Sequence, residues 1–191
     1  GIPVDNHPKF KNKSALEIIM TTLHSGGKFT NKNYTTSGGL HGVGASVVNA
    51  LSSFMKVEVI RDEYLYVQEF SRGLPLSPLT KKNKIKNNNG TSITFKPDPE
   101  IFGEANIFNP IKIFNMLENK AYLFKGVQIN WKCNDTLLKT DSILPSSKKF
   151  CYLNGIIDYM KHKTSSNSFF TSSLFHGCLL YTSDAADDRL S

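Results

Sequence analysis

Apolar residues follow a helical spacing near the start of the chain. The apolar positions between Leu16 and Leu23 recur every three or four residues, which predicts an amphipathic helix over residues 15–24. Ser14 stands just before this helix and Glu17 lies in its first turn, three residues later, which is the spacing of a capping box. A second helix is predicted from near Val43 to Ser53, and its apolar positions are expected to face a core: Val47, Leu51 and Phe54.

Two strands are predicted in the middle of the chain, at residues 56–61 and 64–70. They are separated by Asp62-Glu63, a turn without the Asn-Gly or Asp-Gly pair that usually marks a tight hairpin. A third strand is predicted over residues 91–95.

The last third continues the alternation of helices and strands. Asn109-Pro110 is typical of a helix start, and the helix is predicted to run to about Phe124. Strands are predicted at residues 127–131 and 151–153, and a short helix at residues 155–162.

Composition excludes two classes of protein. The chain has 191 residues, of which 39% are hydrophobic and 20% charged, and this excludes an intrinsically disordered chain. No apolar run approaches the ~18 residues that cross a bilayer, so no membrane span and no membrane partner are predicted. The chain begins at Gly1 with neither an initiator Met nor a signal peptide, which predicts an excerpt of a longer protein.

The net charge of +7 is compatible with a polyanionic partner such as nucleic acid or a nucleotide. Residues 80–90 hold four lysines and no acidic residue, and the simplest interpretation is a solvated surface loop. The three cysteines are far apart, without metal-binding spacing, and fit a reduced cytosolic protein.

The stretch from Thr36 to Ala50, TSGGLHGVGASVVNA, carries the candidate chemistry. Four glycines in seven residues allow positive φ angles and a close approach to a ligand, and a predicted helix begins directly behind them. Its unpaired N–H groups and positive dipole end favour phosphate. A flexible loop with glycines at turns is the alternative. The spacing matches neither a P-loop nor the dinucleotide fingerprint.

Several segments together resemble the ATPase domain of bacterial type IIA topoisomerase B subunits, which are GHKL (Bergerat-fold) ATPases. The matching stretches are GIPV at the start, LHSGGKF at 23–29, the run 37–52, Arg72-Gly73, Gly90-Thr91, PDPEIF at 97–102 and KAYLFKGV at 120–127. The resemblance covers residues 1–160, and the segments 7–16, 70–73 and 97–103 are more similar to topoisomerase IV than to gyrase. It implies an α+β fold, a GHKL sandwich with a mixed, mostly antiparallel sheet and helices on one face.

The resemblance implies ATP as the ligand. Ile2 and Pro3 then lie beside the adenine pocket, residues 25–40 form the ATP lid, and the loop ending at Gly44 wraps the β- and γ-phosphates. Within the lid, Lys28 is expected to meet phosphate, and Tyr34 to bond near the adenine or sugar. The residues implied in ATP binding are Gly1, Ile2, Pro3, Ile19, Met20, Lys28, Tyr34, Gly38, Gly39, Leu40, His41, Gly42, Val43, Gly44 and Thr91.

Simpler roles remain open for single positions. By periodicity Ile19 and Met20 are core residues, Lys28 alone is a solvated lysine, and His41 alone is a turn residue. Val67 stands where the family usually carries an arginine at the pocket rim.

No catalytic or metal-binding residue is assigned to this chain, because in the resembling proteins the general-base glutamate and the Mg²⁺-binding asparagine precede the segment matched by Gly1. We therefore expect the chain by itself not to hydrolyse ATP. The intact protein is expected to use ATP and Mg²⁺.

The resemblance also implies an organisation and partners. Residues 1–160 are expected to be a partial ATPase domain, 161–178 the start of a transducer domain, and 179–191 a tail that is not native. The implied activity is ATP-dependent passage of one DNA duplex through another, in the cytoplasm, with an A subunit, DNA and a second B subunit as partners. A gyrase-type protein is the alternative, and a basic nucleic-acid-binding module is a further one.

Overall fold

The structure, a computed structural model, describes residues 1–8, 10, 12–25, 42–86, 89–104, 108–138 and 144–164. The chain forms two compact units, Gly1–Ile107 and Phe108–Ser191, which are described separately below. No helix in the described ranges is long and apolar enough to span a bilayer.

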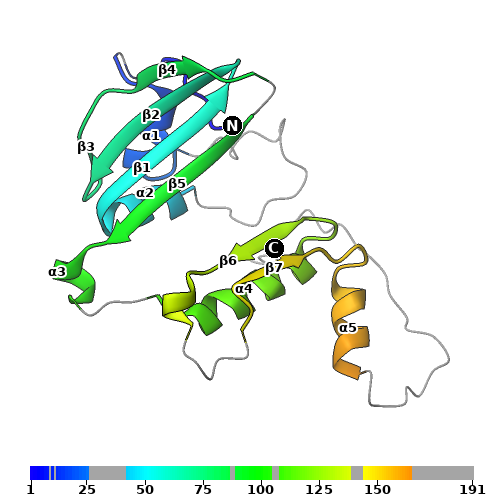
Figure 1. Cartoon of the computed structure of the whole chain (residues 1–191). Coiled ribbons are helices and arrows are strands. Elements are labelled where there is room, and N and C mark those ends of the chain that lie inside the picture. Colours follow the sequence, from blue (N-terminus) through cyan, green and yellow to red (C-terminus); the bar gives the residue numbers. More distant parts are fainter. Residues whose placement is uncertain are drawn as a thin grey trace, which may run out of the picture. The chain divides into compact units, whose positions relative to one another are not determined.

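Unit 1 is built on an antiparallel five-stranded sheet (Figure 1). Its strands are β1 (Ser52–Arg61), β2 (Tyr64–Ser71), β3 (Leu74–Pro75), β4 (Thr80–Lys84) and β5 (Gly90–Pro97). The order is β3-β2-β1-β5, and β4 also pairs with β2. The predicted α+β class with a mostly antiparallel sheet is confirmed.

The turn between β1 and β2 is a tight two-residue hairpin. Asp62 and Glu63 both have positive φ, 50° and 65°. A turn with positive φ at both central residues matches the right-handed twist of the flanking strands, and glycine or asparagine adopts it most easily. The ladder behind the turn runs from the pair Arg61–Tyr64 to the pair Met55–Phe70. Pairing along both strands thus supports a turn that its residue types alone did not predict strongly.

Two helices, α1 (Ala15–Thr21) and α2 (Gly44–Ala50), accompany this sheet. The N-cap of α1 is as predicted, because the Ser14 hydroxyl accepts a hydrogen bond from the Glu17 amide at 3.0 Å. One face of the helices and sheet forms a common core, whose buried members are Val4, Leu16, Met20, Met55, Val57, Val59 and Phe70.

The prediction for the second helix was wrong in its end and in its buried face. The helix ends at Ala50, and Ser52 and Ser53 begin β1. Val47 and Leu51 are 40% and 37% exposed. The buried residues are instead Ser46 and Asn49, one turn apart, and both side chains donate hydrogen bonds to backbone carbonyls. Short polar side chains that satisfy their own hydrogen bonds allow a helix to pack closely, and apolar periodicity cannot reveal them.

The interpretation of residues 80–90 as a loop was also wrong in part. Residues 80–84 form β4, paired with β2 at Tyr66–Lys81 and Tyr64–Lys84. All five residues of β4 are exposed, so it lacks the apolar alternation that marks a half-buried strand. Residues 80–84 have a weak intrinsic preference for the extended conformation, and they form a strand because they pair with β2.

An ion pair joins the end of β2 to the end of β5. Arg72 Nε lies 2.6 Å from Asp98 Oδ2, and Arg72 Nη2 donates to Asp98 Oδ1 at 3.2 Å. Asp98 also accepts from the Glu100 amide and so caps α3 (Pro99–Phe102). These contacts lower the pKa of Asp98, the hydrogen bond from Arg72 contributing most, while burial opposes the change.

We expect the Asp98→Asn substitution to lower stability at neutral pH and to have a smaller effect in acid. The pKa of Asp98 is lower in the folded chain than in the unfolded chain, so the carboxylate stabilises the fold above the ordinary aspartate pKa of about 3.9, and this contribution is lost as pH falls through the folded value. Urea midpoints at pH 7 and pH 3 measure the difference. Asp62→Asn, at a side chain 75% exposed, is the control. An Asp98→Asn deficit that is the same at both pH values would contradict this role.

Unit 2 pairs α4 (Pro110–Leu123) with a two-stranded sheet of β6 (Ile129–Lys132) and β7 (Ser147–Phe150). A short 3-10 turn, Asp135–Leu137, follows β6, and α5 (Ile156–Thr164) follows β7. The predicted Asn109 cap of α4 is confirmed at 3.1 Å. The core consists of Phe114, Ala121, Trp131 and Phe150.

The two predicted strands in unit 2 were displaced. Val127 is 47% exposed and precedes β6, while Cys151 and Leu153 follow β7. The edge-on ring contacts of Phe114 with Trp131 and Phe150 set the position of this hairpin on α4. The domain boundaries predicted at residues 160/161 and 178/179 stay predictions. The first falls within α5, and the second lies outside the described residues.

Candidate functional site

The N-terminal segment lies against the start of β5 in unit 1. The Ile2 amide donates to Thr91 Oγ1 at 3.1 Å, across 89 residues of sequence. A Cβ at Gly1 would lie 2.8 Å from both the Gly90 carbonyl oxygen and Val59 Cγ1, so only glycine fits at this approach. The structure therefore brings Gly1, Ile2 and Thr91 together, as an adenine site at these residues requires.

Helix α1 lies next to this N-terminal segment and forms one wall of the candidate site. Ile19 is half-buried and packs, with Ile2 and Ala45, against the core of unit 1. Met20 is fully buried within that core, which agrees with the structural role that its periodicity left open. The carbonyl of Met20 accepts a hydrogen bond from Asn49 Nδ2 at 2.9 Å, which joins α1 to α2.

The end of the glycine-rich loop leads into α2. Gly42 has a φ of +61°, in the left-handed region that favours glycine. Val43 is the N-cap and gives no side-chain hydrogen bond to the first turn, and a Cβ at Gly44 would meet no atom within 4 Å. The predicted residues Lys28, Tyr34, Gly38, Gly39, Leu40 and His41 lie outside the described residues.

Sequence reasoning left out two residues that the structure places at this wall. Ile93 lies two positions from Thr91 on the same face of β5, opposite Val57, and is 44% exposed. The alternation of β5 was a signal that could have identified it. Ala45 could be found only from tertiary packing, since it has no distinctive side chain.

A shallow groove lies over β1, β2 and β5, and Thr91 is among the residues that line it. Its volume is about 390 Å³, and it is lined by Glu58, Ile60, Leu65, Ile85, Gly90, Thr91 and Ser92. Val67, the departure at the expected pocket rim, lies opposite Glu58 in the β1–β2 ladder.

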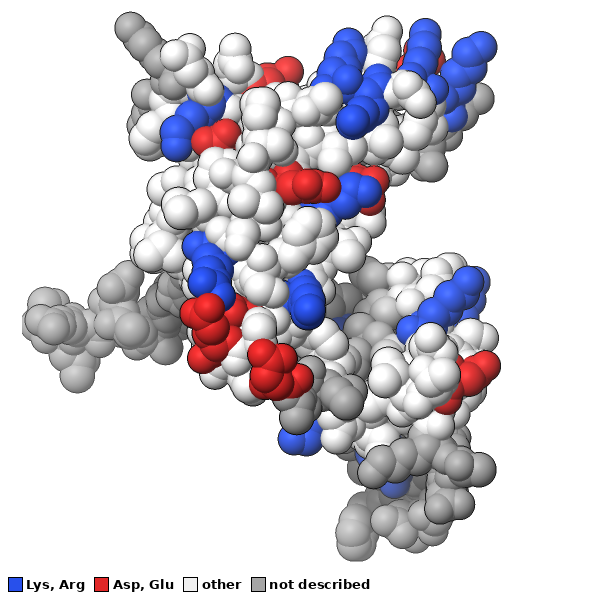
Figure 2. Space-filling model, turned by 60° about the vertical axis from the view of Figure 1, so that its left-hand side comes forward, with Lys and Arg blue, Asp and Glu red and all other residues white. Residues whose placement is uncertain are grey.

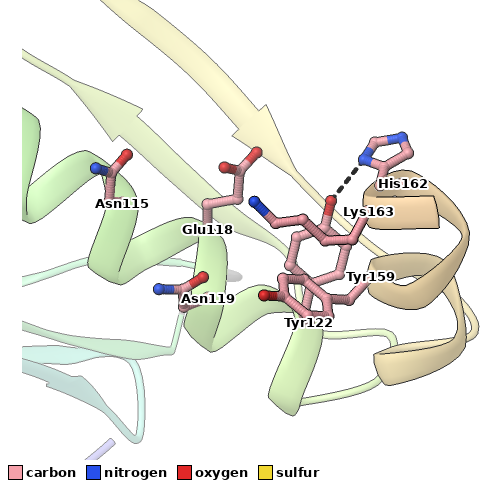
Figure 3. A pocket seen from close by; sticks show the side chains of 7 residues that line it. All are labelled: Asn115, Glu118, Asn119, Tyr122, Tyr159, His162 and Lys163. Carbon is pink, nitrogen blue, oxygen red and sulfur yellow. Dashed lines mark hydrogen bonds between the residues drawn. The ribbon is translucent and has the colours of Figure 1, made fainter. Parts of the chain in front are cut away.

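Unit 2 has a separate cleft between α4 and α5 (Figure 3). Its volume is about 510 Å³, and it is lined by Asn115, Glu118, Asn119, Tyr122, Tyr159, His162 and Lys163. Tyr122 Oη and His162 Nδ1 are 2.8 Å apart, the contact drawn in Figure 3. None of the residues predicted to bind ATP lines this cleft.

The polar groups beside this cleft are engaged in packing. The Tyr152 hydroxyl donates to Glu118 Oε1 at 3.1 Å, and the ring of Tyr152 stacks on Tyr122. Burial and, secondarily, its hydrogen bonds raise the pKa of Tyr152, so its hydroxyl stays protonated and remains a donor. These contacts hold the segment between β7 and α5 against α4.

Metal-ligating side chains do not cluster in the described part of the chain. No group of three His, Cys, Asp or Glu side chains that could hold a metal ion occurs among the described residues. The arrangement in unit 1 instead has an apolar wall, one hydroxyl and backbone amides, which suits a flat base and an anionic group better than a bare cation.

The fold and this arrangement define the class of protein. The structure matches the 43K ATPase domain of Thermus thermophilus gyrase B, a crystal structure in complex with an aminocoumarin, with a TM-score of 0.70 and 34% sequence identity over 93% of this chain and 43% of that chain. No family model matches the sequence. The chain is a homologue of the GHKL-type ATPase domain of bacterial type IIA topoisomerase B subunits, and the resemblance seen in its sequence is confirmed.

Sequence comparison narrows the class to one branch. The chain is 49% identical to the B subunit of DNA topoisomerase 4 from Bartonella bacilliformis over 177 residues, 93% of this chain and 26% of the relative. It is 50% identical to that of Caulobacter vibrioides, over 93% of this chain and 25% of the relative. The B subunit of DNA gyrase from Thermotoga maritima is 43% identical over 85% of this chain and 24% of the relative. The sequence identity is thus higher to these topoisomerase IV subunits than to this gyrase subunit. The chain spans about a quarter of the length of these relatives.

Proposed function

We propose that this chain binds ATP in unit 1, with the adenine beside Gly1, Ile2 and Thr91. The observation that carries the proposal is the hydrogen bond from the Ile2 amide to Thr91 Oγ1, at 3.1 Å. It joins two of the segments that the resemblance assigns to one adenine site, although 89 residues separate them. Homology over 93% of the chain to proteins with this ATPase domain supports the same ligand.

The remaining predicted residues have defined tasks in this proposal. Ile2, Ile19 and Ile93 provide apolar surface for the base, and the Thr91 hydroxyl orients it. Met20 supports this wall from within the core. Lys28 and Tyr34 act from the lid, and Gly38, Gly39, Leu40, His41, Gly42, Val43 and Gly44 present backbone amides to the phosphates.

For the whole protein we propose ATP-driven passage of one DNA duplex through another, as in topoisomerase IV. The partners are an A subunit, DNA and a second copy of the protein, with which it dimerises when ATP binds, and the location is the cytoplasm. Mg²⁺ would neutralise charge on the ATP phosphates, and none of the described residues of this chain is assigned to hold it.

We expect Thr91→Val to weaken ATP binding about tenfold, equivalent to about 1.4 kcal/mol. The substitution keeps the shape of the side chain but removes the hydroxyl that holds the Ile2 amide. Calorimetric titration with a non-hydrolysable ATP analogue measures the dissociation constant.

Thr94→Val is the matched control for this measurement. Thr94 is exposed on the same strand but pairs with Lys56 on the opposite face, whereas Thr91 pairs with the buried Val59. Equal dissociation constants for the two variants would remove Thr91 from the site. No binding of the analogue to the unsubstituted chain would contradict the proposed function itself.

A further inference from the structure

A row of lysines follows one edge of the unit 1 sheet. Residues 80–86 include Lys81, Lys82, Lys84 and Lys86 and no acidic residue, and all four lysines are exposed. We name them the β4 lysine edge. Figure 2 shows basic side chains gathered at the top of the molecule, the end at which β4 lies in Figure 1.

Pairing with β2 places this edge, with a register shift between the partners of Tyr66 and Tyr64. Lys81 and Lys84 lie opposite Tyr66 and Tyr64 of β2, and the Ile85 amide donates to the Glu63 carbonyl at 2.7 Å. Residues in a strand advance by about 3.3 Å each. Phosphates along one strand of duplex DNA advance by about 3.4 Å each along the helix axis. The lysines are therefore closely spaced along this edge, and their flexible side chains can reach neighbouring phosphates.

Most of the charge on this edge is not neutralised within unit 1. Lys84 Nζ pairs with Glu63 Oε2 at 2.7 Å, and Lys81 Nζ lies 3.5 Å above the ring of Tyr64. Lys81, Lys82 and Lys86 form no ion pair with any described residue. Three positive charges thus face solvent along one edge.

Protection of an exposed strand edge is the simpler explanation for lysines at this place. Edge strands often carry a lysine that prevents pairing with another sheet. On a soluble surface, however, charges of both signs are usually interspersed. Four lysines in seven residues, without an acidic residue, form instead a positive stripe of the kind that contacts a polyanion.

We propose that the β4 lysine edge binds the phosphate backbone of duplex DNA, without reading its sequence, through Lys81, Lys82 and Lys86. The choice of DNA rests on the proposed function, which supplies a duplex as the partner of the whole protein. Such contacts position a duplex and depend strongly on salt concentration.

The test compares two triple variants of the full chain. One carries Lys81→Gln, Lys82→Gln and Lys86→Gln. The control carries Lys112→Gln, Lys132→Gln and Lys149→Gln, three exposed lysines of unit 2, and so has the same net charge. Fluorescence anisotropy with a labelled 20-base-pair duplex gives the association constant at several salt concentrations.

The β4 variant is expected to show a slope of log K against log salt less negative by about 3, at about 0.9 per phosphate contact, while the control keeps the original slope. Equal changes in both variants would show that only net charge matters and would overturn the proposal. Unchanged slopes in the β4 variant would also overturn it, as would no DNA binding by the unsubstituted chain. Self-association of the β4 variant with unchanged DNA affinity would show that the lysines protect the strand edge instead. Polyglutamate bound as tightly as DNA at equal salt would show that the partner is an acidic protein.

The same samples are titrated with the ATP analogue. Retained ATP binding with unchanged slopes refutes the DNA contact alone. Absent ATP binding in the unsubstituted chain refutes the proposed nucleotide site, while the slopes still report on the lysine edge.

Discussion

We expect the Phe70→Ala substitution to destabilise unit 1 by about 3–5 kcal/mol, the range found for truncating a buried phenylalanine. Phe70 has no exposed surface and lies opposite Met55 in the β1–β2 ladder, within the core that α1 shares with the sheet. The substitution removes apolar contacts and leaves a cavity that neighbouring side chains fill only in part. Because whole domains have a stability of roughly 5–15 kcal/mol, this loss would leave unit 1 marginal. Urea unfolding followed by circular dichroism measures it.

Phe95→Ala is the matched control on the same sheet face. Phe95 lies on the other side of Met55, in the β1–β5 ladder, but is 41% exposed. Its truncation removes less buried area and opens no closed cavity, so we expect a loss of about 1 kcal/mol. Similar unfolding midpoints for the two variants would show that the core does not centre on Phe70.

The second large effect is expected at Asn49, where Asn49→Asp should destabilise unit 1 by roughly 3 kcal/mol or more. Asn49 is fully buried, and its Nδ2 donates to the Met20 carbonyl at 2.9 Å. An aspartate would place an acceptor against that carbonyl and would have to take up a proton or bury a charge. The Oδ1 atom of Asn49 has no hydrogen-bond partner in the described part of the chain, so nothing there is positioned to stabilise a carboxylate.

Asn49→Ala separates the lost hydrogen bond from the buried charge. It should cost about 2 kcal/mol, since the Met20 carbonyl then lacks its donor. Asn83→Ala, on the exposed strand β4, is the control and should change stability little. Urea unfolding at pH 7 and pH 4 distinguishes the cases, because protonation should relieve part of the defect in the aspartate variant only. An aspartate variant no less stable than the alanine variant would show that the site is accessible to water.

The local elements were predictable where one residue pattern was strong. Neighbouring residues predict the Ser14 cap, the Asn109 cap and the strands β1, β2 and β5, and the structure confirms them. The buried face of α2 was not predictable, because Ser46 and Asn49 are buried through hydrogen bonds to the backbone rather than through apolar surface. Strand β4 was not predictable for a related reason, since every residue in it is exposed and only its pairing with β2 makes it a strand.

For the candidate site, too, the sequence predicted one part and only the structure revealed the other. The glycine-rich run and the stretches that surround it identify the class of ATPase, because glycine is needed wherever backbone approaches a ligand closely. The sequence could not give the order of contacts in space, such as the Ile2 amide on Thr91 or Ile93 beside it.

By itself, the sequence determined the class of the protein and most of its helices and strands, because capping, alternation and a glycine motif are properties of short segments. Only the tertiary structure decided which residues are buried, that α2 packs through Asn49, and that residues 80–84 form an edge strand of the sheet. These features depend on contacts between segments far apart in the chain, whose free energy is set by packing and hydrogen bonding and not by the neighbouring residues.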